Sequence, residues 1–187
     1  ATVKSLTNQN GSVKVTWTKV ENAAGYKVYR KAAGYDSYGM LINIKNGSTT
    51  SYTDKYAKSI RNGKASYYYV VPYYSGTSNV VLKTNTKTNY YMTRPTFSTL
   101  GTSGSKALKA TWKKNANASG YQVRYSLNSD MSDAKTVNVS SGCTLSKKIS
   151  GLSGGKTYYV QVRAYKTYND IKYYSAWSVK KSKYVVK

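Results

Sequence analysis

Residues 13–29 contain the segments Val-Lys-Val-Thr-Trp (13–17) and Gly-Tyr-Lys-Val-Tyr (25–29), separated by seven residues. In both segments the apolar side chains fall on every second position. A period of two is typical of a β-strand that buries one face, because successive side chains point to opposite faces of the sheet. The segments therefore predict two strands, with Trp17 and Tyr26 pointing into a core.

The same pattern returns later in this chain of 187 residues. Leu-Lys-Ala-Thr-Trp at 108–112 is followed, again after seven residues, by Gly-Tyr-Gln-Val-Arg at 120–124. A further alternating segment, Tyr-Tyr-Val-Gln-Val at 158–162, matches Tyr-Tyr-Tyr-Val-Val at 67–71. Self-similarity of this kind indicates two homologous units rather than a low-complexity tract.

The boundary between the units is predicted near Thr93-Arg94-Pro95, where proline fixes its own φ and disfavours helix in the residue before it. We expect domains over residues 1–93 and 94–187. No Gly/Ser-rich tether separates them, which predicts a short, stiff linker. Turn sequences such as Asn10-Gly11 punctuate the short strands, so each unit is predicted to be an all-β sandwich or barrel.

The composition gives little support to catalysis or metal binding. The chain has no His and one Cys, Cys143, which argues against Cys/His zinc clusters and His-dependent triads. Of its six acids only Asp130 and Asp133 form a close pair, in a polar segment predicted to be a loop. We therefore predict no catalytic residue, cofactor or metal site. Cys143 is interpreted either as a relic of a cytosolic protein or as a small buried hydrophobe, and burial is favoured.

A Trp on the second strand, Gly-Tyr-x-Val opening the third, and Gly-Leu before Tyr-x-Val-x-Val-x-Ala together resemble fibronectin type III domains. The likeness is to tandem copies in surface or secreted proteins of Gram-positive gut bacteria. It implies two immunoglobulin-like β-sandwiches of about seven strands each, with Tyr158 tying a corner between two sheets. The residues expected in the cores are Trp17, Tyr26 and Tyr67 in the first copy, and Trp112, Tyr121, Leu152 and Tyr158 in the second.

Basic residues dominate the charged positions. The chain carries 30 Lys and Arg against 6 Asp and Glu, a formal net charge of +24 that is spread over both copies. Sequence-specific binding of nucleic acid is not supported, because Lys predominates whereas base readout favours Arg. Two interpretations stay open: diffuse attraction to an anionic cell-wall polymer or acidic glycan, and simple solubility of a secreted surface.

Tyrosine supplies the second candidate surface, since the chain has 22 Tyr residues. Exposed rings on a sheet can stack against sugars or a partner protein. They also serve as ordinary cross-strand pairs, and that role is favoured. The residues expected on this outward surface are Tyr29, Tyr68 and Tyr74 in the first copy, and Tyr159, Tyr165, Arg124 and Arg163 in the second.

Taken together, these features favour a non-enzymatic extracellular spacer or adhesion segment of a larger bacterial surface or secreted protein. The alternative is a binding module for anionic cell-wall polymer or glycan, acting through a surface rich in Lys and Tyr. A host surface protein and neighbouring domains of a longer chain are further expected partners, and the segment is expected to be a monomer. No run approaches the ~20 consecutive apolar residues that cross a bilayer, so no membrane span is predicted.

Overall fold

The computed structural model describes residues 1–56, 62–76 and 85–186. Within these ranges the chain forms fifteen β-strands and no α-helix, as its alternating sequence predicts. The chain divides into two compact units, Ala1–Tyr91 and Met92–Lys187. The division falls two residues before the expected boundary, because Met92 packs into the core of the second unit.

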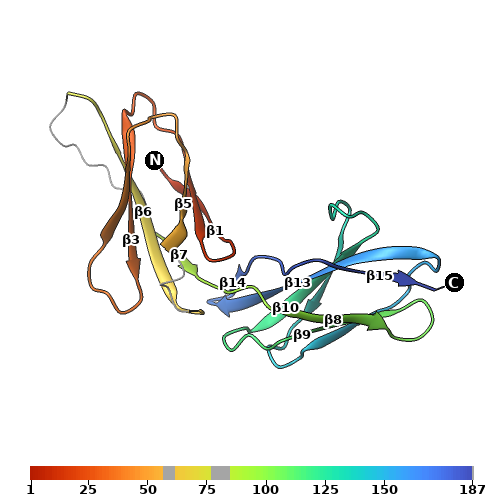
Figure 1. Ribbon diagram of the computed structural model, residues 1–187. Helices are drawn as coiled ribbons and strands as arrows, with labels where there is room; N and C mark the ends of the chain where they lie inside the picture. Colours follow the sequence, from red (N-terminus) through yellow and green to blue (C-terminus); the bar gives the residue numbers. More distant parts are fainter. Residues whose placement is uncertain (57–61, 77–84, 187) are drawn as a thin grey trace. The chain divides into compact units, whose positions relative to one another are not determined.

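The first unit is a sandwich of two antiparallel sheets, drawn from red to yellow-green in Figure 1. One sheet has the strand order β1-β2-β5 and the other β4-β3-β6-β7. Buried side chains from both sheets form a single core. The strands are β1 (Val3–Asn8), β2 (Val13–Trp17), β3 (Gly25–Ala32), β4 (Gly39–Ile44), β5 (Ser51–Asp54), β6 (Ala65–Tyr73) and β7 (Lys87–Tyr90).

The second unit repeats this sandwich with the orders β12-β9-β8 and β11-β10-β13-β14. Its longest strand, β13, pairs with β15 along its first half and with β14 along its second half (Figure 1). The strands are β8 (Phe97–Thr102), β9 (Leu108–Trp112), β10 (Gly120–Ser126), β11 (Lys135–Val139), β12 (Ser146–Ile149), β13 (Lys156–Tyr168), β14 (Ile171–Tyr174) and β15 (Lys181–Val185).

Each core contains one indole packed on one tyrosine. Trp17 is 1% exposed and its ring centroid lies 5.4 Å from that of Tyr26; Trp112 is 3% exposed and lies 5.2 Å from Tyr121. The indole Nε1 atoms of Trp17 and Trp112 are buried, and no described residue offers either of them a hydrogen-bond acceptor. Because an unpaired buried donor costs about 1–3 kcal/mol, the two indoles contribute through apolar packing rather than through hydrogen bonding.

In the second unit Leu152 and Tyr158 are also buried. The backbone N–H of Ser153 donates a hydrogen bond to the Tyr158 hydroxyl over 3.0 Å. This bond closes the turn before β13 onto the start of the strand, the arrangement that the fibronectin-like pattern implies for this tyrosine.

The sequence-based phase of β6 is wrong by one residue. Tyr68, expected to face outward, is 0% exposed in the core, whereas Tyr67, expected in the core, is half-buried on the outward face. The pairing registers explain the error: Val70 lies opposite Val28 as Val162 lies opposite Val123. The two copies are therefore offset by 92 positions on this strand rather than by the 91 used to match Tyr67 with Tyr158.

The Gly of each Gly-Tyr-x-Val segment is required by close packing. A Cβ on Gly25 would lie 2.1 Å from the carbonyl oxygen of Ile44 and 2.4 Å from the hydroxyl of Tyr73. A Cβ on Gly120 would likewise lie 2.4 Å from a backbone carbonyl oxygen and 2.4 Å from the hydroxyl of Tyr165. In each unit an aromatic ring crosses the sheet over a residue that has no side chain.

Candidate functional site

The outward face of the four-stranded sheet in the first unit carries a cluster of rings. We call the cluster the tyrosine face and define it as Tyr29, Tyr38, Tyr67, Tyr69 and Lys31. Tyr29 on β3 lies opposite Tyr69 on β6, and their rings stack with centroids 4.8 Å and planes 13° apart. Tyr38, from the loop before β4, meets the Tyr69 ring edge-on at 4.8 Å and 64°. These three rings form one continuous aromatic surface.

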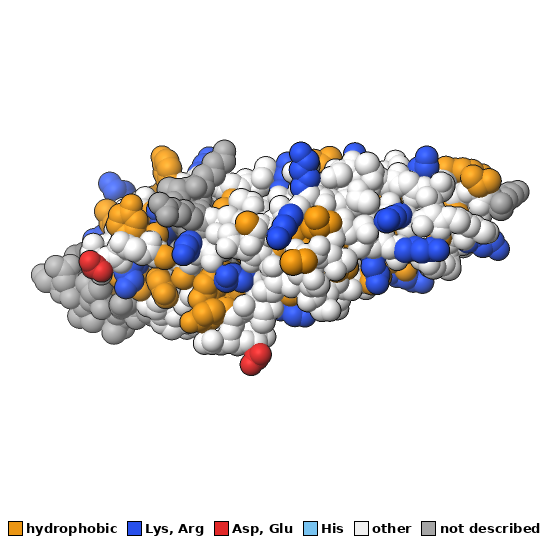
Figure 2. Space-filling view, turned by 90° about the horizontal axis from the view of Figure 1, so that it is seen from below, with side chains coloured by type: hydrophobic (Ala, Val, Ile, Leu, Met, Phe, Trp, Pro, Cys, Tyr) orange, Lys and Arg blue, Asp and Glu red, His pale blue; other side chains and the backbone are white. Residues whose placement is uncertain are grey.

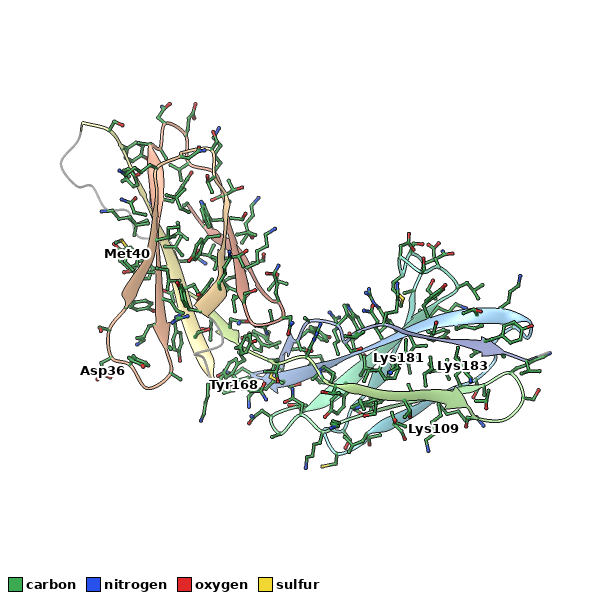
Figure 3. All side chains as sticks on the ribbon, in the orientation of Figure 1. Asp36, Met40, Lys109, Tyr168, Lys181 and Lys183 are labelled. Carbon is green, nitrogen blue, oxygen red and sulfur yellow. The ribbon has the colours of Figure 1, made fainter. Side chains whose placement is uncertain are left out.

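Lys31 completes the tyrosine face. Its Nζ lies 5.5 Å from the ring centroid of Tyr38 and 5.4 Å from that of Tyr67, within the range of a cation–π contact. All five side chains of the face are half-buried. Met40, on β4 opposite Tyr29, is 55% exposed and extends the apolar surface at this side of the sheet (Figure 3).

The chemistry of the tyrosine face follows from these contacts. Burial, together with the neighbouring phenols of Tyr29 and Tyr38, raises the pKa of Tyr69, so its hydroxyl stays neutral at physiological pH. The face thus offers partly exposed ring carbons, a neutral hydroxyl and the ammonium of Lys31. Such a surface can stack on the C–H face of a sugar and attract an anionic group beside it.

Of the residues expected on the outward surface of the first unit, Tyr29 lies in the tyrosine face. Tyr68 does not, because it belongs to the core. Tyr74 lies just after β6 and is half-buried. The sequence analysis did not include Tyr38 or Lys31 in this surface. Tyr38 comes from a loop, so no strand period could indicate its direction.

The corresponding face of the second unit is built differently. The guanidinium carbons of Arg124 and Arg163 each lie 4.4 Å from the ring centroid of Trp177. Arg163 also lies 3.9 Å from the ring centroid of Tyr174. The same two arginines donate hydrogen bonds to Gln161 and Gln122, respectively. Burial lowers the pKa of both arginines. The sequence predicted both arginines on this face, and they lie there. Their guanidinium planes contact rings of the same face, and their N–H groups donate to its glutamines.

Two further tyrosines were expected on this face. Tyr159 is half-buried, and the Nζ of Lys180 lies 5.2 Å from its ring centroid. Tyr165 is 4% exposed, so the expectation of an exposed ring is wrong. Tyr174 packs against the Tyr165 ring at 5.8 Å, and the absent side chain of Gly120 lets the ring lie close to the sheet.

A buried charge cluster in the first unit was also missed. Asp54 is fully buried, accepts a hydrogen bond from the Tyr68 hydroxyl at 2.9 Å and pairs with Arg30 Nη1 at 2.7 Å. A signal for it exists in the sequence. Arg30 has the same strand phase as Tyr26 and Val28, and a charged residue in an inward phase needs a partner.

Charges on the surface are dispersed. Figure 2 shows Lys and Arg side chains scattered over the face in view, with few acidic side chains among them. Lys181 and Lys183 lie on β15, whereas Lys109 lies on β9 (Figure 3). In the described ranges no three His, Cys, Asp or Glu residues come together as a metal site.

The Asp130 and Asp133 pair lies in a loop, as predicted. The Ser132 amide donates to Asp130 Oδ1 at 2.9 Å and lowers the pKa of that carboxyl.

Cys143 is exposed, so its expected burial is wrong. It follows Gly142 in a turn, where no strand period could indicate its environment. Within the described ranges no helix is both long enough and apolar enough to cross a membrane.

Comparison with known proteins identifies only structural neighbours. No family model matches the sequence, and no curated protein matches it. The fold is similar to that of the FN1–FN3 domains of chicken CNTN1, with 19% sequence identity and a TM-score of 0.46, over 100% of this chain and 65% of that one. It is also similar to a segment of two fibronectin type III domains from chicken tenascin, with 14% identity and a TM-score of 0.44, over 99% of this chain and 100% of that one.

Proposed function

We propose that the chain is a non-enzymatic extracellular spacer or adhesion segment of a larger bacterial surface or secreted protein. The observation that supports this most is that each unit closes its own core around a buried Trp–Tyr pair. A unit with a complete core can be repeated along a chain without help from a partner. Neighbouring domains of the parent chain are the expected partners, and the segment itself is expected to be monomeric.

A retention experiment tests the spacer function. The chain is applied to purified bacterial cell walls and to a polysaccharide array, at low and at high salt. A pure spacer is not retained under either condition. Retention at low salt that disappears at high salt would instead support the second function described next, because screening weakens attraction between exposed charges.

We infer a second candidate function, binding of an anionic cell-wall polymer or glycan, from the tyrosine face. The parallel stack of Tyr29 and Tyr69, with Lys31 held among neighbouring rings, supplies both a stacking surface and a positive charge. A host surface protein that presents acidic sugars would offer the same chemistry. The dispersed Lys residues on the remaining surface would add attraction without specificity.

Matched variants test this second function. Tyr69→Ala removes the central ring and Lys31→Gln removes the charge, so both are expected to reduce retention. Tyr184→Ala and Lys109→Gln are the controls, since Tyr184 is 51% exposed and Lys109 is exposed on the second unit. If all four variants were retained as well as the parent chain, the tyrosine face would not be the binding site.

A further inference from the structure

One end of the second unit is open. A cavity of about 400 Å³ lies where the β10–β11 loop approaches the β12–β13 loop, and we call it the end cavity. It combines apolar walls with a polar rim. Its lining residues used below are Tyr125, Leu127, Asp133, Lys135, Leu152 and Tyr158.

The walls of the end cavity are aromatic and fixed. The rings of Tyr125 and Tyr158 lie 6.3 Å apart at 53°, and Leu152 is buried in the adjoining core. The hydrogen bond from Ser153 N–H holds the Tyr158 hydroxyl in place. Leu127 is 48% exposed, so it presents apolar surface at the mouth. These walls need no rearrangement to receive a ligand.

The rim of the end cavity carries charged groups that the protein itself does not use. Asp133 and Lys135 are exposed, and within the described ranges neither side chain has a hydrogen bond or ion pair. The loop that carries them is nonetheless held by its own bonds. Ser126 Oγ donates to the Ser132 carbonyl oxygen at 2.7 Å, and Asn128 Nδ2 donates to Ser132 Oγ at 2.9 Å. The rim is therefore ordered, and its charges remain available.

The first unit carries different residues at the corresponding strand positions. In the repeat Asp54 takes the position of Ile149, since Asp54 pairs with Val13 as Ile149 pairs with Leu108. Arg30 takes the position of Tyr125, since Arg30 lies opposite Tyr68 as Tyr125 lies opposite Val160. There the Arg30–Asp54 pair occupies the end of the core. The aromatic wall that Tyr125 supplies is thus particular to the second unit, because the first unit has a charged pair at these strand positions.

We propose that the end cavity binds one sugar residue of a glycan. A pyranose presents an apolar C–H face that can lie against an aromatic ring, and hydroxyl groups that both donate and accept hydrogen bonds. Asp133 can accept from such hydroxyls and Lys135 can donate to them. A purely apolar ligand would leave both charges unused, whereas a simple anion would face the carboxylate of Asp133. The volume lies in the range of about 300–1,000 Å³ typical of small-ligand sites.

The test uses the whole chain and four probes: glucose, galactose, mannose and N-acetylglucosamine. Each is titrated while the backbone amide signals are followed by NMR. We expect at least one probe to give saturable shifts confined to the segments 125–135 and 151–158, with a dissociation constant on the order of 1 mM for so small a ligand. Absence of saturable shifts with all four, or shifts centred on other segments, would overturn the proposal.

Variants make the assignment specific. Asp133→Asn is expected to weaken binding about tenfold, because a charged hydrogen-bond acceptor is lost. Ser153→Phe places a ring at the rim and should abolish binding. Asp170→Asn is the matched control, since it removes the same charge from an exposed turn outside the cavity. Thermal unfolding of each variant shows that its fold is intact. Equal binding by Asp133→Asn and Asp170→Asn would exclude the proposed rim.

This site is independent of the tyrosine face. Tyr69→Ala, which tests the face, is expected to leave the NMR titration of the end cavity unchanged. Conversely, Ser153→Phe is expected to leave salt-dependent retention on cell walls unchanged. Failure of one proposal is therefore distinguishable from failure of the other.

Discussion

The hydroxyl of Tyr68 donates a hydrogen bond to Asp54 Oδ2 over 2.9 Å, inside the core of the first unit. The same oxygen is paired with Arg30 Nη1 at 2.7 Å. Tyr68 and Arg30 belong to one sheet and Asp54 to the other, so this single carboxylate joins both layers of the sandwich. The second unit places apolar residues at the positions corresponding to Asp54 and Tyr68, namely Ile149 and Val160.

Tyr68→Phe is expected to lower the free energy of unfolding by about 1–3 kcal/mol, because the buried carboxylate loses a donor and the ring is otherwise retained. Urea denaturation measures the change. Tyr67→Phe is the control, since Tyr67 lies on the outward face and the change there should stay within about 0.5 kcal/mol. Equal effects at the two positions would show that the bond to Asp54 contributes nothing.

Alkaline pH should reveal the same bond. Burial, with the charge of Asp54 and the bond to it, raises the pKa of Tyr68 above its ordinary value of 10.0. The folded state therefore holds this proton more tightly than the unfolded state. The associated stability is fully present below pH 10 and is lost as the pH rises further. Unfolding free energies measured across this range should fall more steeply for the parent chain than for Tyr68→Phe. Parallel curves would contradict the assignment.

The buried indoles should dominate the stability of their units. Trp112→Ala and Trp17→Ala are each expected to cost about 3–5 kcal/mol, a large share of the ~5–15 kcal/mol that stabilises a domain. Trp177→Ala is the control. Trp177 contacts both Arg124 and Arg163 on the outward face, where cation–π contacts are worth about 0.5–2 kcal/mol. Thermal melting that left Trp112→Ala as stable as the parent would contradict its role in the core.

How far sequence predicts structure differs between two strands of this chain. On β13 apolar and polar residues alternate, and the predicted inward set of Tyr158, Val160, Val162 and Ala164 is buried. On β6 three consecutive tyrosines precede two valines, so no alternation distinguishes the two faces. The register of β6 against β3 then decides its phase, as the register of β13 against β10 does in the second unit. A sequence read alone does not contain these registers.

The candidate sites were less predictable than the fold. Tyr29 was placed correctly because its strand has a clear period, but Tyr38 and the end cavity depend on loops. Tyr165 shows a different limit. Its phase is outward, yet Tyr174 from the next strand covers its ring. A two-residue period reports which side of a sheet a residue is on and does not report what covers that side.

Cys143 offers a direct check of one corrected prediction. As an exposed residue and the single thiol of the chain, it should react with a disulfide reagent in the native state at close to the rate seen in denaturant. Absorbance of the released thiolate measures both rates. A native rate that is strongly suppressed would restore the buried interpretation and would contradict the turn geometry around Gly142.

Gly120→Ala is expected to destabilise the second unit by about 1–3 kcal/mol, the usual range for overpacking. The added methyl group would meet the Val139 carbonyl oxygen and the Tyr165 hydroxyl, each at 2.4 Å. A ring can shift, but the carbonyl oxygen belongs to the paired strand β11 and cannot move without disturbing the sheet. Gly101→Ala is the matched control. Gly101 is also in a strand, has open space around its Cβ position and should be neutral or slightly stabilising. Chemical denaturation compares the two. An equal response would mean that Gly-Tyr-x-Val marks strand propensity and not a close crossing of the ring over the sheet.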